Sequence, residues 1–181
     1  MIHVALLRGI NVGGNRRVPM ADLRRVMTDL GYEGVTTYIN SGNVLFETKR
    51  ADHLAMANTI EDALEGEFGF RCRVLVRSGT DVVAIAKAIP EHWGDRTQRT
   101  GDVAYLLDGL DPKEVAKALG PREGIDNVVY ARGALLWSVE RKDLNRNGLQ
   151  RLVGTPYYQQ ATVRNVNTAR KLAALVEDRK A

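Results

Sequence analysis

The first 78 residues alternate between the two hydrophobic periods that distinguish strands from helices. A mainly apolar segment at residues 2–8, which ends in Arg8, predicts a buried strand. After Pro19, apolar residues recur at helical spacing until Gly31, which predicts the first helix. A hairpin of 35–39 with 44–47, a helix at 51–66 and a strand at 72–77 complete the pattern. This β-α-β-β-α-β order predicts the split βαβ arrangement of ferredoxin-like domains.

A similar order of elements returns after a linking helix at 80–89 and a polar loop that ends at Gly101. The expected elements are a strand at 102–108, a helix from Asp111 to Gly120, strands at 126–131 and 134–139, a short helix at 143–153, an extended segment at 161–164 and a helix from Thr168 to Asp178. The repetition predicts an α+β fold with two ferredoxin-like units, related by internal duplication, with antiparallel sheets and a C-terminal helix. The expected boundaries are a first unit at 1–78, a helical linker and loop at 79–101, and a second unit at 102–181.

Composition narrows the class of protein. The chain has 181 residues, of which 44% are hydrophobic, so it has enough apolar material for a core. No apolar segment reaches the roughly 18 residues that span a bilayer, and no secretion signal opens the sequence. A single cysteine excludes an internal disulfide framework. We therefore expect a cytoplasmic protein that has no membrane partner; composition leaves the oligomeric state open.

Charge is distributed unevenly although the net charge is only +4. Residues 1–28 hold five arginines and one acidic residue, and residues 132–181 hold ten basic and four acidic residues. Two basic ends that flank an acidic middle would form an anion-binding patch if the fold brings them together. The alternative is that these charges lie on solvated helix faces.

Two loops rich in glycine and asparagine carry the candidate chemistry of the first unit. The segment 9–17 joins the first strand to the first helix, and Asn40-Ser41-Gly42-Asn43 forms the turn of the hairpin. In the split βαβ topology both loops lie at the same end of the sheet, so we expect them to be neighbours. Glycines expose backbone N–H groups and arginines attract anions, which favours a phosphate, sulfate or carboxylate ligand. The alternative is a tight loop whose asparagines satisfy their own backbone.

Named nucleotide motifs are excluded for this loop. No Gly-Lys-Ser/Thr follows Gly9-x-x-x-Gly13-Gly14, so the segment is not a Walker A loop. The glycine spacing also differs from the dinucleotide fingerprint G-x-G-x-x-G.

A third polar cluster, residues 163–168, precedes the last expected helix. Asn167 or Thr168 would cap that helix, whereas Arg164 and Asn165 have no such structural role and would complete a ligand site. The candidate ligand-binding residues are Arg8, Asn11, Gly13, Gly14, Asn15, Arg16, Asn40, Ser41, Asn43, Arg164, Asn165 and Asn167.

Other site chemistries find little support. The three histidines lack metal-ligand spacing, and no Ser/His/Asp arrangement or paired-carboxylate motif stands out. Cys72 alternates with Val74 and Val76 on an apolar strand face, with Arg71, Arg73 and Arg77 on the other face, so it is expected in the core. The first strand has no aromatic residue, which argues against RNA recognition by base stacking. The sequence indicates neither a cofactor nor a catalytic residue.

The chain resembles the bacterial domain of unknown function 1697 family. The resemblance rests on residues 5–14, on Val18-Pro19-Met20 with Leu23, and on residues 37–44. Gly154-Thr155, the segment 162–168 and Lys171-Leu172 resemble its C-terminal signature, with Val166 in place of an expected tryptophan. The resemblance implies a two-unit α+β fold related to ferredoxin-like domains and places its hallmark residues in the three polar clusters. It implies no activity.

Three functional hypotheses follow from the sequence. The first is a protein that binds a small phosphorylated or nucleotide-like anion at the glycine, asparagine and arginine clusters. The second is an enzyme that acts on such a ligand, for which no general base is evident. The third is an interaction module that contacts a nucleic acid through its phosphates, or a protein.

Overall fold

The computed structural model describes residues 1–13, 16–95 and 97–180. The chain divides into two compact units, Met1–Gly79 and Thr80–Ala181. The segment expected to be a separate linker, 79–101, falls within the second unit from Thr80 onward.

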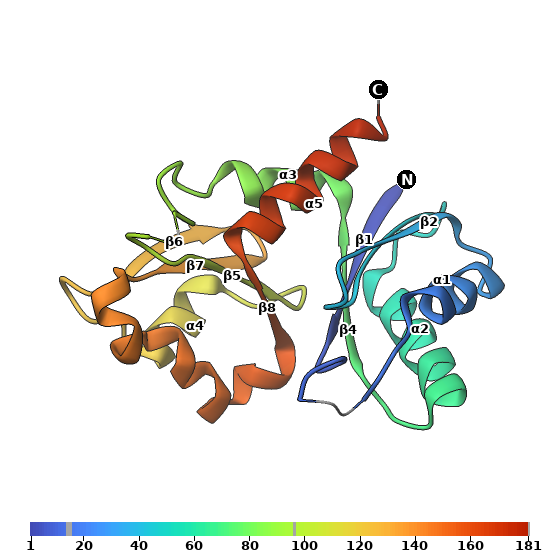
Figure 1. The fold of residues 1–181 in the computed structure, drawn as a ribbon, viewed down its shortest axis with the longest axis horizontal. Helices are drawn as coiled ribbons and strands as arrows, with labels where there is room; N and C mark the ends of the chain where they lie inside the picture. Colours follow the sequence, from blue (N-terminus) through green and yellow to red (C-terminus); the bar gives the residue numbers. More distant parts are fainter. Residues whose placement is uncertain (14–15, 96, 181) are drawn as a thin grey trace. The chain divides into compact units, whose positions relative to one another are not determined.

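The first unit contains one four-stranded antiparallel sheet and two helices. Its elements are β1 (Ile2–Arg8), α1 (Met20–Asp29), β2 (Glu33–Tyr38), β3 (Asn43–Glu47), α2 (His53–Phe68) and β4 (Arg73–Ser78). The strands lie in the order β2-β3-β1-β4, so the first strand pairs with the third and the fourth. Figure 1 shows α1 and α2 together on one face of this sheet. The α/β order predicted from hydrophobic periodicity is confirmed for this unit.

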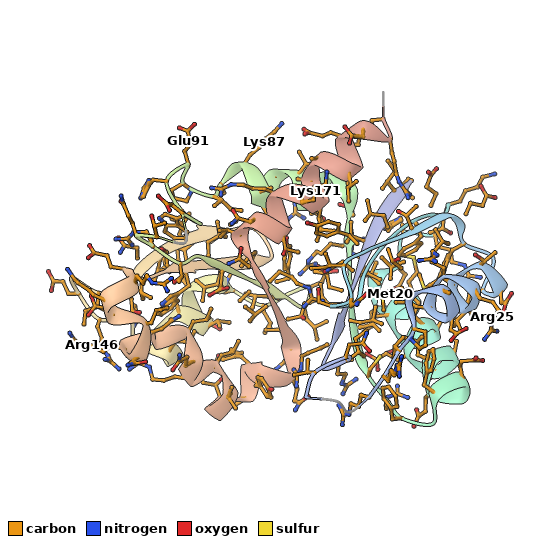
Figure 2. The ribbon with its side chains drawn as sticks, in the orientation of Figure 1. Met20, Arg25, Lys87, Glu91, Arg146 and Lys171 are labelled. Carbon is orange, nitrogen blue, oxygen red and sulfur yellow. The ribbon has the colours of Figure 1, made fainter. Side chains whose placement is uncertain are left out.

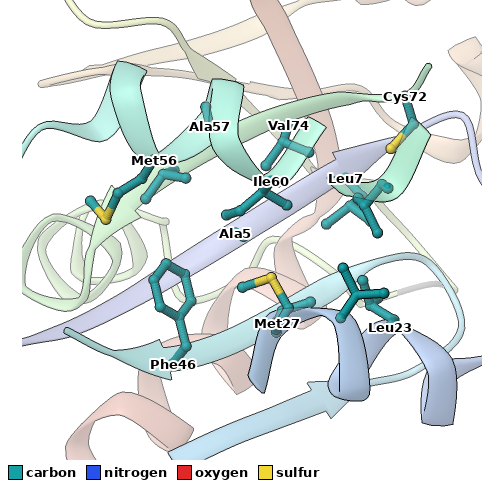
Figure 3. Close-up of a cluster of buried hydrophobic side chains, with 14 of the residues drawn as sticks. Ala5, Leu7, Leu23, Met27, Phe46, Met56, Ala57, Ile60, Cys72 and Val74 are labelled. Carbon is teal, nitrogen blue, oxygen red and sulfur yellow. The ribbon is translucent and has the colours of Figure 1, made fainter. Parts of the chain in front are cut away.

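The core of the first unit lies between the sheet and its two helices. Ala5, Leu7 and Phe46 project from the strands toward Met27 of α1 and Ile60 of α2, all of them buried (Figure 3). Cys72 also lies in this cluster, as its alternation with Val74 and Val76 predicts. The opposite face of β4 is not uniformly polar, because Arg77 is buried whereas Arg73 is exposed.

Local signals account for the ends of α2. Asp52 accepts a hydrogen bond from the backbone N–H of Ala55 at 2.9 Å, and Gly69 ends the helix with φ of +73°. Arg25 of α1, labelled in Figure 2, is exposed. It pairs with Glu67 of α2 and with Asp29 at 3.5 Å. Charges of this kind occupy solvated helix faces.

The second unit contains the other antiparallel sheet. Its elements are α3 (Gly79–Lys87), β5 (Asp102–Leu106), α4 (Pro112–Leu119), β6 (Asn127–Ala131), β7 (Ala134–Ser138), η1 (Arg141–Arg146), η2 (Gly148–Gly154), η3 (Pro156–Gln160), β8 (Ala161–Asn165) and α5 (Val166–Asp178). Its strand order, β6-β7-β5-β8, is equivalent to that of the first sheet.

Two expectations for this unit need correction. The segment 143–153 is not one short α-helix but belongs to a series of three 3-10 helices that extends to Gln160. The last helix begins at Val166 rather than Thr168, because Val166 is the first residue of its buried apolar face.

The core of the second unit contains Trp137, whose indole N–H donates a hydrogen bond to the carboxylate of Asp126 at 2.8 Å.

Candidate ligand-binding loops

The two polar loops of the first unit are in direct contact, as the topology predicts. The backbone N–H of Leu7 donates to the carbonyl of Gly42 at 2.8 Å, and the amide of Asn11 donates to the carbonyl of Asn40 at 2.9 Å. We call the described residues of 9–18 together with 39–43 the loop pair. Two of the candidate residues, Gly14 and Asn15, lie outside the described residues.

Asn11 joins three segments of the loop pair. Its amide nitrogen also donates to the carbonyl of Val18 at 3.0 Å, and its side-chain oxygen accepts from the N–H of Val18 at 2.8 Å. The residue has φ of +54°, a conformation that asparagine tolerates better than most residues. These three hydrogen bonds use both donors of the amide and one acceptor site, so Asn11 has a structural role in the loop pair.

The hairpin turn is fixed in a similar way. The fully buried amide of Asn43 donates to the carbonyl of Tyr38 at 3.0 Å and to the hydroxyl of Ser41 at 2.9 Å. Gly42 has φ of +74°, and a Cβ built on it would lie 2.6 Å from Cβ of Leu7. The close approach of the hairpin to β1 therefore depends on glycine at this position.

Exposed positive charge lies beside this fixed backbone. Arg16 and Arg17 are exposed, and the guanidinium of Arg16 lies 5.9 Å from the ring centroid of Phe70. Arg8 is half-buried at the end of β1, where it is paired in register with Arg73. Asn40 and Ser41 are exposed on the hairpin side of the loop pair. Guanidinium groups suit recognition of a planar or tetrahedral anion.

Sequence reasoning missed the apolar component of the loop pair. Val12 is 70% exposed and Ile39 is 48% exposed. Ile39 also has φ of +49°, which is a sterically costly conformation for a β-branched residue. The sequence analysis placed Ile39 at the end of the expected strand 35–39, whereas β2 ends at Tyr38 and Ile39 lies in the turn.

The third candidate cluster has structural roles within the second unit. Asn165, expected to be free for a ligand, is the N-cap of α5, because its side-chain oxygen accepts from the N–H of Asn167 at 2.9 Å. Its amide nitrogen donates to the carbonyl of Gly101 at 3.1 Å. Asn167 does not cap the helix. Instead its amide donates to the carbonyl of Gly94 at 3.1 Å and holds the polar loop that precedes β5.

Arg164 is almost completely buried on β8. Its guanidinium donates to the hydroxyl of Thr162 at 3.1 Å and to the carbonyl of Val163 at 2.9 Å. Burial lowers the pKa of Arg164 to about 10, and the neighbouring Tyr105 opposes this shift.

Within the described part of the chain, no three His, Cys, Asp or Glu side chains gather closely enough to hold a metal ion. Burial raises the pKa of Cys72 to about 11, which makes a nucleophilic role unfavourable. None of the described helices has the length and apolar character that would be needed to span a membrane.

Comparison with known proteins gives a family match and a structural match. Residues 1–137 match the family described as "Protein of unknown function (DUF1697)". A conserved bacterial protein from Streptococcus pneumoniae has a similar solved structure, with a TM-score of 0.80 and 27% sequence identity. The similarity covers 97% of this chain and 98% of that chain. No curated protein matches the sequence.

Proposed function

The chain belongs to the DUF1697 family, and we propose that it binds a small phosphorylated anion at the loop pair of the first unit. The observation that carries this proposal is the exposure of Arg16 and Arg17 beside a backbone that Asn11 fixes through three hydrogen bonds. Hydrogen bonds that already hold part of a loop reduce the cost of ordering it when a ligand binds.

The start of α1 adds a further favourable electrostatic contribution. Pro19 occupies the N-cap position of α1, and no side chain caps this helix end. The first backbone N–H groups of the helix carry a positive partial charge, which favours an anion close to the loop pair. Asp22 in the first turn opposes that effect in part.

Internal hydrogen bonds assign structural roles to four of the candidate asparagines. The side chains of Asn11, Asn43, Asn165 and Asn167 all bond within their own units. In this proposal the ligand contacts come from Arg16, Arg17, Asn40 and Ser41, with Arg8 close to the loop pair at the end of β1. The internally bonded asparagines hold the backbone.

Thermal stabilisation by anions tests the proposal. The panel comprises inorganic phosphate, pyrophosphate and a nucleoside monophosphate, at concentrations high enough to reveal a millimolar site. We expect at least one of these anions to raise the Tm of the wild type, and the double variant Arg16→Ala/Arg17→Ala to lose that shift. The matched control is Lys49→Ala, which removes an exposed cation just beyond β3, at the opposite end of the sheet. The proposal is wrong if no anion stabilises the wild type, or if the double variant keeps the full shift.

The same variants separate this function from the alternatives. A nucleic-acid module would retain a labelled oligonucleotide with an affinity that falls steeply with salt. An enzyme would turn over a phosphorylated substrate, and that turnover would be lost in the double variant.

A further inference from the structure

Two histidines meet at the far end of the first sheet from the loop pair. His3 of β1 and His53, the first residue of α2, have ring centroids 5.6 Å apart at an interplanar angle of 78°. His3 also stacks on Phe46 of β3, with centroids 5.7 Å apart and planes inclined by 27°. These contacts join the start of the central strand to the first turn of a helix.

His3 is only 2% exposed, and neither of its ring nitrogens makes a hydrogen bond with any described residue. A neutral imidazole tolerates such a site, but an imidazolium would carry two buried donors, for which the backbone of Arg50 gives only partial compensation. Protonation of His3 in the closed arrangement is therefore unfavourable.

The charged groups around His3 increase this cost. Burial is the main reason that the pKa of His3 is lowered. Positive charge on His53 and on the N-terminal ammonium lowers the pKa of His3 further. The backbone of Arg50 opposes the shift. The ammonium itself is held by the carbonyl of Thr48 at 2.9 Å.

Among the described residues, the groups that shift the pKa of His3 include no carboxylate. Its strand neighbours in register are Phe46 on β3 and Ser78 on β4. Asp52, at the start of α2, is engaged with the N–H of Ala55. Tyr32, which packs on Phe46 with centroids 4.5 Å apart, is a neutral phenol near physiological pH.

We propose that His3 and His53 form an acid-sensitive latch: protonation of His3 separates the start of β1 from the first turn of α2. When the contact opens, water reaches His3 and the imidazolium becomes solvated. The open state binds more protons than the closed state once the pH falls below about 6.5, the ordinary value for histidine. The free energy of opening therefore decreases as the pH falls through this value toward the lower pKa of the closed state.

Hydrogen exchange and histidine NMR on the full chain test the latch. We expect protection factors for residues 2–6 and 53–57 to be lower at pH 5.5 than at pH 7.5, with the intrinsic exchange rates taken into account. His3→Phe keeps the aromatic contact with Phe46 and should lose this pH dependence. His92→Gln removes an exposed histidine from the second unit and should leave it unchanged.

A second variant keeps the test decisive if His3→Phe fails to fold. His53→Gln removes the neighbouring charge, so the pKa of His3 measured by NMR should rise toward its ordinary value. The proposal is overturned if His3 of the wild type titrates at or above that value. It is equally overturned if the protection of residues 2–6 and 53–57 does not change with pH, or if His53→Gln leaves the titration of His3 unaltered.

Discussion

The carboxylate of Glu61 on α2 accepts a hydrogen bond from the backbone N–H of Val74 on β4 at 2.8 Å. β4 is the last strand in the order of its sheet, so this side chain takes the place of a neighbouring strand. The other carboxylate oxygen contacts Arg71 at 3.2 Å and Arg73 at 3.3 Å. Glu61 is only 2% exposed, and these three groups stabilise its buried carboxylate.

We expect Glu61→Ala to destabilise the first unit by about 3 kcal/mol. The substitution leaves a buried N–H unsatisfied and removes a buried ionic partner of two arginines. Glu61→Gln keeps an acceptor for Val74 and should cost less. The measurement is urea denaturation, with the reactivity of the Cys72 thiol as the probe. Cys72 is the single cysteine of the chain and lies in the core of the first unit, so its labelling reports the unfolding of this unit.

Glu65→Gln is the matched control for Glu61. Glu65 contacts the same Arg71 at 2.8 Å but is exposed, so its loss should change the stability by less than about 1 kcal/mol. Equal effects of Glu61→Ala and Glu65→Gln would contradict the structural role of the buried carboxylate.

Two glycines of the loop pair make a matched comparison. Gly42→Ala places a Cβ 2.6 Å from Leu7 and 2.9 Å from the Cδ1 atom of Ile10, whereas Gly13→Ala meets no described atom within 4 Å. Both residues have positive φ, so both substitutions cost about 1–2 kcal/mol in backbone strain. Only Gly42→Ala adds steric overlap, and we expect it to cost about 2 kcal/mol more.

Thermal unfolding of the first unit measures this difference, with Cys72 labelling as the probe. A Gly42→Ala variant as stable as Gly13→Ala would mean that the hairpin does not pack closely on β1. Neither glycine offers a side chain to a ligand, so this comparison tests the scaffold alone.

Cys72 should be unreactive in the folded chain. Its side chain is buried, and burial together with the charge of Glu61 raises the pKa of its thiol to about 11. Because the thiolate is the reactive form, a disulfide reagent at pH 8 should label the native protein far more slowly than the denatured protein. One equivalent should react once denaturant is added, and rapid labelling of the native chain would contradict the assigned packing.

Periodicity predicted the elements well because most of them bury one regular face. The apolar residues Leu23, Val26 and Met27 of α1 face the core, as their spacing indicates. The start of α5 was misassigned because Asn167 and Thr168 resemble capping residues. The buried Val166 already belongs to the helix, which shifts the cap to Asn165.

The candidate site was harder to predict than the fold. The topology correctly placed the hairpin turn beside the segment after β1. It could not show which asparagines serve the backbone, because the partners of Asn11 are carbonyl and N–H groups brought close by tertiary structure. For the same reason, the backbone partner of Glu61 and the ring contacts of His3 could not be predicted from the sequence.

Asp102 at the start of β5 should make the stability of the second unit depend on pH. Burial alone raises the pKa of its carboxyl to about 6, above the unfolded value of about 3.9. The folded state therefore binds more protons between these values, so its stability decreases as the pH rises from about 4 to about 6. Above pH 6 the charge at this partly buried position costs at most about 3 kcal/mol. Asp102→Asn should then be more stable than the wild type at pH 7.5 and nearly equal to it at pH 4.

Urea unfolding monitored by tryptophan fluorescence measures this difference. Both tryptophans of the chain, Trp93 and Trp137, belong to the second unit, so their fluorescence reports that unit selectively. Asp178→Asn, at an exposed position near the end of α5, controls for the loss of one carboxylate. A stability difference between Asp102→Asn and the wild type that stays constant from pH 4 to 7.5 would show that the carboxyl does not titrate in this window.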